Sequence, residues 1–440
     1  MPGREADAGQ SGDGDDRGLR PGPVLHPAAC WVREVANMSH EAGMAETAAP
    51  LEGDDRKTAA LAGWSAHPPI NRADDGTLHV HGYAIARAIL RAPESEQAGF
   101  GADLIRRTRS IMRLPVLFLE GQPHQELRRA TARFFAPRAV DENYRALMAR
   151  EAGRLIETLC RERSGRLDVM AMDISTAVAA EIAGLTEHLW PGMSRRIAGF
   201  LKNPPIEERP SPGVVWRIFT SQLKLLKFFL VDVKPSIRAR RRAPRPDVIS
   251  HLLALGYKDT EILTECVIFG AAGMVTTREF IVVATLHLLA RPALRQRFLA
   301  GDEAAQRAIL EEILRLEPVI GRLTRRVTAA VELPNGMRLE AGAKAAVDIR
   351  SANADPQAVG ACPFHLDPDR HIDPKIGAAV MGFGDGRHRC PGAFIAMQES
   401  AIFLSRLLAV PGLRLAGDPV AVWNPLIHSY EYRICTIAVD

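Results

Sequence analysis

The sequence predicts a mainly α-helical fold with a small β region, and three observations support this fold class. From His67 onward, apolar residues recur mostly at helical spacing. About thirty residues from Asp259 are apolar on nearly every face, which is typical of a helix through the middle of a large protein. Short alternating runs are confined to residues 325–350, where Pro334-Asn335-Gly336 predicts a turn between strands.

The composition is that of a globular protein and excludes several classes of function. The chain has 440 residues, of which 47% are hydrophobic and 25% charged, so a large core is expected. Its net charge of +4 gives no electrostatic reason to expect nucleic acid as a partner. A run of about 18 uncharged apolar residues is absent, and the amino terminus lacks a signal peptide's apolar segment, so we expect a cytoplasmic protein that spans no membrane.

The chain is expected to form a disordered tail followed by one domain. Residues 1–60 are rich in Gly, Ala, Asp and Pro and show little periodicity, which is typical of disorder. Residues 61–440 contain neither an internal repeat nor a linker between folded parts. We therefore predict a single domain over residues 61–440.

The helices can be justified in order along the chain. The first has apolar residues at helical spacing and is expected to stop at Pro137. The long apolar helix is expected to begin with Asp259 or Thr260 as its cap and to end before Pro292. The expected helical stretches are 121–136, 142–160, 167–189, 214–230, 259–290, 303–317 and 391–409, with a loop at 205–213.

A basic segment, RARRRAPRPD, follows the helix at 214–230 and contains five arginines. Two interpretations are open: a solvated connection between helices, or a docking patch for an acidic partner. The arginines are Arg238, Arg240, Arg241, Arg242 and Arg245.

Cys390 is the cysteine best placed for chemistry. The six cysteines are far apart without a C-x-x-C pair, which argues against a disulfide framework and a cysteine-rich zinc site. Pro391 favours a helix start directly after Cys390, and cationic residues precede it, so a lowered thiol pKa is expected. Gly384 and Gly386 allow a tight turn that directs backbone N–H groups at the sulfur. A dinucleotide-binding loop is excluded because Arg389 stands where it needs glycine, and the remaining alternative is an inert buried thiol.

The segment from Phe383 to Gly392 resembles the heme-binding signature of the cytochrome P450 heme-thiolate monooxygenases. The resemblance implies the cytochrome P450 fold, a long central helix over the heme, and heme b (iron protoporphyrin IX) as the cofactor. It implies Cys390 as the proximal iron ligand and metal-binding residue. It further implies Phe383, Gly384 and Gly392 as cofactor-binding residues around the sulfur, and His388 as a hydrogen-bond partner of a heme propionate.

Other segments match the same family in the same order. Glu312 and Arg315 resemble its E-x-x-R motif, which with Arg370 implies a buried structural ion cluster. His124 and Arg128 resemble its H-x-x-x-R motif, one helical turn apart and implied to bind a propionate. Arg325 resembles a further propionate-binding arginine, although the neighbouring Arg326 leaves the register open.

The segment from Ala272 to Thr277 resembles the family's oxygen-activating helix, with Ala272 beside the cofactor. The resemblance implies that Gly273 marks a local opening of the helix and that Thr276 orients a water for proton delivery. The alternative is that Gly273 only allows close packing of a neighbouring element and that Thr276 has no role in the reaction. Val275 stands where the family has an acid, so either Glu279 substitutes through water or the reaction needs less proton delivery. A second departure, Ala354 in place of arginine, is interpreted as a surface change.

The resemblance implies an oxidoreductase that oxidises an apolar small molecule of secondary metabolism with dioxygen, by C–H hydroxylation or a related reaction. No flavin or iron–sulfur module is visible, so ferredoxin and ferredoxin reductase are the expected electron donors, and Arg387 suits an acidic partner. Pocket walls are expected from residues 95–118, 190–230, Phe269 and Ala272, with Met274 in the core. The alternatives are a heme-thiolate enzyme of oxidative coupling and a non-catalytic heme-binding protein.

Overall fold

The computed structural model describes residues 68–106, 113–201 and 212–440. The tail expected over residues 1–60 lies outside the described residues. So do most of the loop expected at 205–213 and parts of the expected pocket walls at 107–112 and 202–211.

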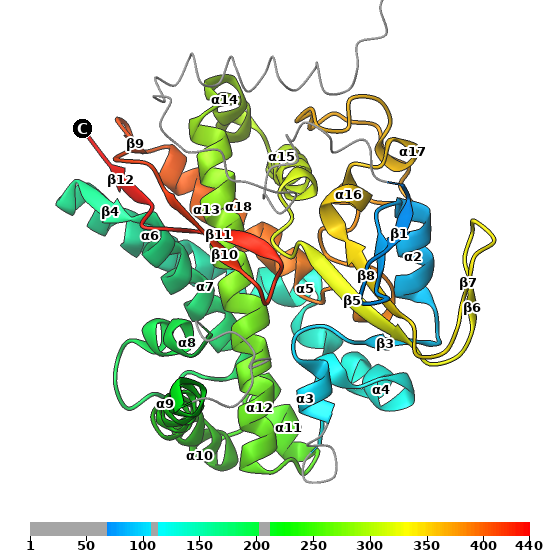
Figure 1. Ribbon diagram of the computed structural model, residues 1–440. Helices are drawn as coiled ribbons and strands as arrows, with labels where there is room; N and C mark the ends of the chain where they lie inside the picture. Colours follow the sequence, from blue (N-terminus) through cyan, green and yellow to red (C-terminus); the bar gives the residue numbers. More distant parts are fainter. Residues whose placement is uncertain (1–67, 107–112, 202–211) are drawn as a thin grey trace, which may run out of the picture.

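Helices make up most of the described chain (Figure 1). The first α-helices are α2 (Tyr83–Arg91), α3 (Ala102–Arg106), α4 (Gly121–Thr131), α5 (Pro137–Ala139), α6 (Arg145–Glu162) and α7 (Leu167–Ala183). Next come α8 (Met193–Leu201), α9 (Pro212–Phe228), α10 (Lys234–Arg242), α11 (Val248–Ala254), α12 (Asp259–Phe269) and α13 (Thr276–Leu289). The last are α14 (Pro292–Ala300), α15 (Glu303–Leu316), α16 (Ile349–Asn353), α17 (Pro356–Val359) and α18 (Ala393–Leu408). Short 3₁₀ turns are η2 (Val116–Phe118), η3 (Ala132–Phe134) and η7 (Gly386–His388), and π turns are η4 (Val140–Tyr144), η5 (Phe229–Val233) and η6 (Gly270–Val275).

The strands are short and form four small sheets among the described residues. The largest has the order β1 (Ile70–Arg72), β2 (Leu78–Val80), β8 (Lys344–Asp348), β5 (Arg322–Val327) and β3 (Ser95–Gln97). In this sheet β2 and β8 are parallel and the other neighbours antiparallel. The smaller sheets are β4 (Ser164–Arg166), β12 (Thr436–Ala438) and β9 (Arg414–Leu415); β10 (Val420–Asn424) and β11 (Ser429–Arg433); and β6 (Val331–Glu332) and β7 (Arg338–Leu339).

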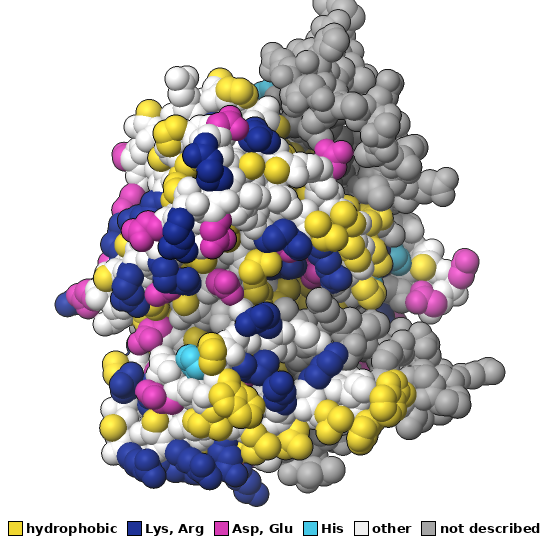
Figure 2. All heavy atoms as spheres, turned by 90° about the vertical axis from the view of Figure 1, so that its left-hand side faces the viewer, with side chains coloured by type: hydrophobic (Ala, Val, Ile, Leu, Met, Phe, Trp, Pro, Cys, Tyr) yellow, Lys and Arg dark blue, Asp and Glu magenta, His cyan; other side chains and the backbone are white. Residues whose placement is uncertain are grey.

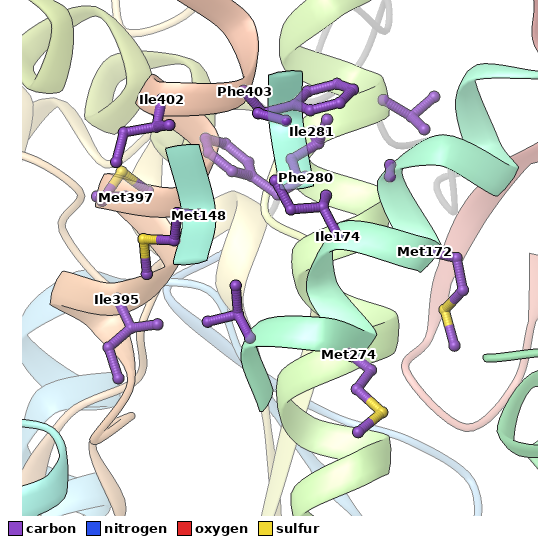
Figure 3. Close-up of a cluster of buried hydrophobic side chains, with 14 of the residues drawn as sticks. Met148, Met172, Ile174, Met274, Phe280, Ile281, Ile395, Met397, Ile402 and Phe403 are labelled. Atoms are coloured by element: carbon purple, nitrogen blue, oxygen red, sulfur yellow. The ribbon is translucent and has the colours of Figure 1, made fainter. Parts of the chain in front are cut away.

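A long helix formed by α12, η6 and α13 crosses the middle of the molecule (Figure 1). It is apolar on several faces because α7 and α18 both pack against it. Figure 3 shows how Met148 from α6, Ile174 from α7, Phe280 and Ile281 from α13, and Phe403 from α18 meet in the core. Among the described residues, Asp259–Leu289 is long and apolar enough to cross a membrane by length and composition, but its packing is that of a core helix.

The mainly helical fold is confirmed, whereas the expectation that all strands come late is wrong. Strands β1, β2 and β3 precede residue 100, and β2 pairs with β8 across more than 260 positions of sequence. A strand of three residues is too short to show alternation, so its pairing partner decides it.

Several helix ends also differ from those expected. Pro137 begins α5 rather than stopping a helix that runs up to it, because α4 ends at Thr131 and the backbone tightens into η3. Helix α7 ends at Gly184, whose φ of 87° favours glycine. Lys258, not Asp259 or Thr260, caps the long helix, and the Glu261 carboxylate accepts the Lys258 N–H at 2.8 Å.

Candidate active site

The loop before α18 presents Cys390 through a tight backbone turn. Gly384 and Gly386 have φ values of 67° and 68°, a region that favours glycine. A Cβ at Gly386 would overlap the carbonyl oxygen of Leu90 at the end of α2. The Cys390 N–H donates to the Phe383 carbonyl at 2.9 Å, which closes the turn. The predicted hairpin around Cys390 is therefore present, and close packing against α2 requires glycine at 386.

Cys390 is accessible to solvent, but its sulfur also lies close to many protein atoms, which desolvate it. Burial raises the pKa of its thiol, whereas the Gly392 N–H and the charges of Arg128 and Arg389 act to lower it. The expected lowering of the pKa is therefore wrong, because desolvation outweighs the helix terminus and the cations. The N–H group directed at the sulfur is found, at Gly392.

A buried ion cluster anchors α15 to the segments that lead to the Cys390 loop. The Glu312 carboxylate accepts two bonds from Arg315, both at 2.7 Å, and one from Arg370 at 3.3 Å. Arg315 is 1% exposed, so an unpaired charge there would be costly. Asn353 accepts the Met381 N–H at 2.8 Å and donates to the Arg315 carbonyl at 2.9 Å. The predicted Glu312, Arg315 and Arg370 cluster is present as expected.

Arg387 and Asp385 attach the loop to the segment after α2. The Arg387 guanidinium donates to the carbonyls of Ala92, Pro93 and Ser95 at 3.0–3.2 Å. Arg91 donates to the Asp385 carboxylate at 2.9 Å. Arg387 was expected to suit an acidic partner, and its guanidinium also has a structural use because it donates to three carbonyls of the fold.

The His388 side chain contacts the carboxylate of Glu120. Its Nε2 lies 3.1 Å from both Glu120 carboxylate oxygens, and its ring centroid is 4.3 Å from that of His124. Burial acts to raise the pKa of Glu120, but the bond and charge of His388, the Gln97 N–H and the charge of Arg387 leave it lowered. His388 therefore already has a carboxylate partner at the position where the resemblance implied a propionate.

His124 and Arg325 are buried polar side chains in the same region. Burial lowers the pKa of His124 to about 4, aided by the charges of His388 and Arg128, so its ring is neutral at pH 7. The Nδ1 atom of His124 is buried and has no hydrogen-bond partner. Arg325 is 2% exposed, forms no ion pair with the described residues, and burial lowers its pKa to about 10.

The register of the two neighbouring arginines is settled by their contacts. Arg326 pairs with Asp103 at 2.7 Å and with Glu96 at 3.6 Å, near the surface. Arg325 alternates to the buried side of β5. Of the two, Arg325 is the arginine available for an anionic group in the interior.

These residues fit an iron porphyrin with two carboxylates. A buried guanidinium without an ion-pair partner among the described residues is costly, so Arg325 is suited to pair with an anionic group of a ligand. Arg128 is close enough to Cys390 for the two charges to interact, and donates to the Arg389 carbonyl at 2.6 Å. Thiol, guanidinium and imidazole groups thus lie around one loop, and these are groups that a heme with a cysteine ligand requires.

The central helix changes its winding where the resemblance places oxygen activation. Residues Gly270–Val275 form the π turn η6, and the Thr276 hydroxyl donates to the Ala272 carbonyl. Ala272 is exposed although this helix crosses the middle of the molecule. A Cβ at Gly273 would meet Ala179 at an ordinary 3.5 Å, so protein packing alone does not require glycine there. The predicted opening of the helix is present.

Three other side chains of this helix have structural surroundings. Val275 packs against the hydrophobic core, and Met274 is fully buried within it, as expected (Figure 3). The Glu279 carboxylate accepts the Tyr432 N–H at 2.9 Å and pairs with Arg278 at 3.1 Å. Glu279 therefore holds β11 to α13, and the proposal that it relays protons to Thr276 is corrected by this placement.

Some relevant residues were not predicted. Glu120 and Asn353 carry no motif that distinguishes them from other polar residues at the ends of helices, and only tertiary contacts show their partners. Ala354 is 6% exposed, so its interpretation as a surface change is wrong. A cavity of about 170 Å³ lies elsewhere, between α15 and α18, and its lining includes none of the predicted site residues.

Sequence comparison identifies relatives over most of the chain. The family model described as Cytochrome P450 matches residues 306–410. Erythromycin C-12 hydroxylase of Saccharopolyspora erythraea is 28% identical, over 80% of this chain and 85% of the relative. Cyclomarin C epoxidase CymV of Salinispora arenicola is 30% identical, over 68% of this chain and 74% of the relative.

Solved structures agree with these relatives. The myxobacterial cytochrome P450 CYP267B1 in complex with myristic acid has a TM-score of 0.69 and 26% identity, and the match covers 85% of this chain and 94% of that chain. P450BioI, solved with an acyl carrier protein ligated to hexadec-9Z-enoic acid, has a TM-score of 0.69 at 21% identity, covering 86% and 96%. The second likeness concerns the fold alone.

Proposed function

We propose that this chain, which belongs to the cytochrome P450 family and is a monooxygenase-type oxidoreductase, inserts oxygen from dioxygen into an apolar small molecule. The observation that carries the proposal is the Cys390 loop, whose exposed thiol lies among buried imidazole and guanidinium groups. An inert buried thiol would be covered by apolar side chains and would need none of these cations.

Cys390 is the residue that would bind the iron, and heme b, when bound, supplies the oxygen-activating redox chemistry. Burial raises the pKa of the free thiol, so Cys390 would lose its proton only on binding the iron. Arg325, Arg128 and His124 would bind the carboxylates, since they are donors without an acidic partner among the described residues. His388 would add a donor only when it is protonated, because Glu120 already occupies one ring nitrogen.

Thr276 is the residue that would hold and pass a proton. Its Oγ1 donates to the Ala272 carbonyl, which leaves the oxygen lone pairs free to accept from a water. Gly273 would leave space for that water beside η6, because its nearest neighbour in other elements is Ala179. Val275 contributes no proton and packs against the core instead.

The names of the relatives support the substrate class. Two of them act on erythromycin and cyclomarin C, and a solved relative holds myristic acid. We therefore propose an apolar product of secondary metabolism as the substrate. The sequence shows no flavin or iron–sulfur module, so a ferredoxin and its reductase are proposed as electron donors, in the cytoplasm.

Val275 supports a second candidate, oxidative coupling without oxygen insertion. A reaction of this kind needs less proton delivery than hydroxylation, and the described residues place no carboxylate at this position.

The experiment uses the heme-loaded protein and a panel of apolar natural products. Compounds that shift the iron's spin state are incubated with the protein, ferredoxin, reductase and ¹⁸O₂. The masses of the products are then measured by mass spectrometry. One ¹⁸O atom per product supports oxygen insertion. An unlabelled oxidised product supports coupling and overturns the first proposal. Absence of both spin shift and product across the panel contradicts both.

A further inference from the structure

Helix α9 and the π turn after it carry a stripe of exposed, large apolar side chains. Their spacing of three and four residues places them on one side of the helix. Large apolar side chains are usually buried, so exposed ones at regular helical spacing indicate a surface that binds another molecule. The stripe consists of Trp216 (66% exposed), Phe219 (52%), Leu223 (49%), Leu226 (50%) and Leu230 (44%).

The loop before α8 extends this surface. Leu189 and Trp190 are 62% and 59% exposed, and the Leu189 N–H donates to the Val231 carbonyl at 2.9 Å. Arg196 holds the loop, since it donates to the Trp190 carbonyl at 2.9 Å and pairs with Asp232. We call these seven side chains the apolar face. Each of its side chains is 44–66% exposed, and an exposed apolar patch of this kind marks an interaction site.

Basic residues border the apolar face. The chain between residues 212 and 246 contains nine lysines and arginines and a single acid, Asp232, which is buried. Two of the nine, Arg240 and Arg241, pair with Asp247 and Asp259, so the exposed positive charge comes from the others. Figure 2 shows yellow apolar side chains along the lower part of this side of the molecule, with dark-blue cations at its lower edge. The exposed cations include Lys224, Lys227, Arg238, Arg242 and Arg245.

We propose that the apolar face binds the surface of an anionic lipid bilayer. Trp, Phe and Leu along one side of a helix, bordered by Lys and Arg, are the pattern of a helix that lies in the plane of a membrane interface. The stripe from Trp216 to Leu230 is about 21 Å long, so a flat surface can receive all of it at once. Anionic headgroups would neutralise the bordering cations.

The charge pattern disfavours a second copy of this chain as the occupant. A twofold dimer brings the same patch of both copies together, so the cations around one apolar face would approach those around the other. An acidic protein would match the charge, but the described stripe is a ridge rather than a groove. Helix α9 packs its other side on α8, where Lys224 donates to the Gly199 carbonyl at 3.2 Å, so binding needs no unfolding.

The experiment measures binding of the full-length, heme-loaded protein to vesicles. Vesicles of phosphatidylcholine alone are compared with vesicles that contain 30% phosphatidylglycerol, by co-sedimentation and tryptophan fluorescence. We expect binding to the anionic vesicles with a blue shift. The double variant Trp216→Gln, Leu223→Gln should lower the partition coefficient at least tenfold. Lys227→Gln with Arg242→Gln should lower it about tenfold and reduce its dependence on salt.

Matched controls separate the apolar face from exposed residues in general. Leu299→Gln with Val420→Gln, and Arg150→Gln with Arg161→Gln, remove exposed side chains elsewhere and should leave binding unchanged. Circular dichroism checks that all variants fold. Absence of binding to anionic vesicles, equal binding to neutral vesicles, or a solution dimer that Leu223→Gln dissociates would each overturn the proposal. A shared loss of binding in the controls would also contradict it.

Discussion

The Cys390 loop and the central helix around Thr276 are held in opposite ways. The loop is fixed by polar contacts. The Glu312 carboxylate accepts hydrogen bonds from two arginines, and Arg387 donates to three backbone carbonyls. The helix segment is fixed by apolar packing, and the Thr276 hydroxyl bonds within its own helix.

This difference explains how the central helix accommodates the departure from its family at position 275. A loop held by buried charges tolerates little change, because removal of one partner leaves the other unpaired. A helix held by apolar contacts accepts valine at position 275 with no loss of packing. We therefore expect the polar Cys390 loop to be constrained in sequence, whereas the apolar segment around Thr276 can vary.

The largest expected effect is from Cys390→Ala. The reduced, carbon-monoxide-treated variant should lack the red-displaced Soret band of a thiolate-bound heme and should show no monooxygenase turnover. Cys160→Ala, an exposed cysteine on α6, should keep both properties. A red-displaced band in the Cys390→Ala protein would contradict the assignment of the iron ligand.

The second test removes one charge from the polar side. Arg315→Ala leaves Glu312 buried without its closest partner and should lower the free energy of unfolding by about 3–5 kcal/mol, measured by urea titration. Glu142→Gln breaks the exposed pair with Arg138 and should change it by less than about 1 kcal/mol. Similar effects for both variants would show that burial of the cluster is unimportant.

The third test concerns Glu265 in α12, which is 2% exposed and accepts the Val116 N–H at 3.0 Å. Burial raises its pKa to about 8, so the folded state retains a proton that the unfolded state has lost above about pH 4.5. The contribution of the protonated Glu265 carboxyl to the free energy of unfolding is therefore fully present below pH 4.5 and is lost as the pH rises to 8. Glu265→Gln should therefore raise the free energy of unfolding by about 3–4 kcal/mol more at pH 8 than at pH 5, measured by urea unfolding.

Glu261, one turn earlier, provides the matched control. Its pKa is lowered, because the N–H groups of Lys258 and Arg113 outweigh burial, so its contribution is lost only as pH falls. The free energy of unfolding of the Glu261→Gln variant should differ from that of the unmodified protein by the same amount at every pH between 5 and 8. The same pH dependence in both variants would refute the assignment to Glu265.

The smallest expected effect is from Thr276→Ala, which removes the proposed proton carrier. We expect about tenfold less product for each electron pair consumed, because water replaces the hydroxyl only in part. Glu279→Gln keeps an oxygen for the Tyr432 N–H and should change this ratio by less than about twofold. An equal loss in both variants would restore Glu279 as the proton relay.

The comparison also shows which predictions the sequence supported. The family resemblance and the mainly helical fold are confirmed, and the glycine turn at Cys390 and the Glu312 cluster are present as expected. Those predictions rested on residues close in sequence or on a complete motif. The roles of the site residues toward heme, dioxygen and substrate stay predictions.

Two predictions about site residues involved contacts between distant segments. Glu279 is one turn from Thr276 in sequence, but its partner Tyr432 is 153 residues away. Arg387 precedes Cys390 but is used by carbonyls near residue 93. In both cases the side chain's direction depends on what packs against it, which local spacing does not contain.

The sequence alone determined the mainly helical fold and the glycine turn before Cys390, because residue type and local spacing decide these features. Only the tertiary structure decided that Arg325 rather than Arg326 is buried, that Glu120 meets His388, and that no described residue covers the apolar side of α9. The physical reason is that burial and pairing are properties of two surfaces in contact, and one sequence segment specifies only one of them.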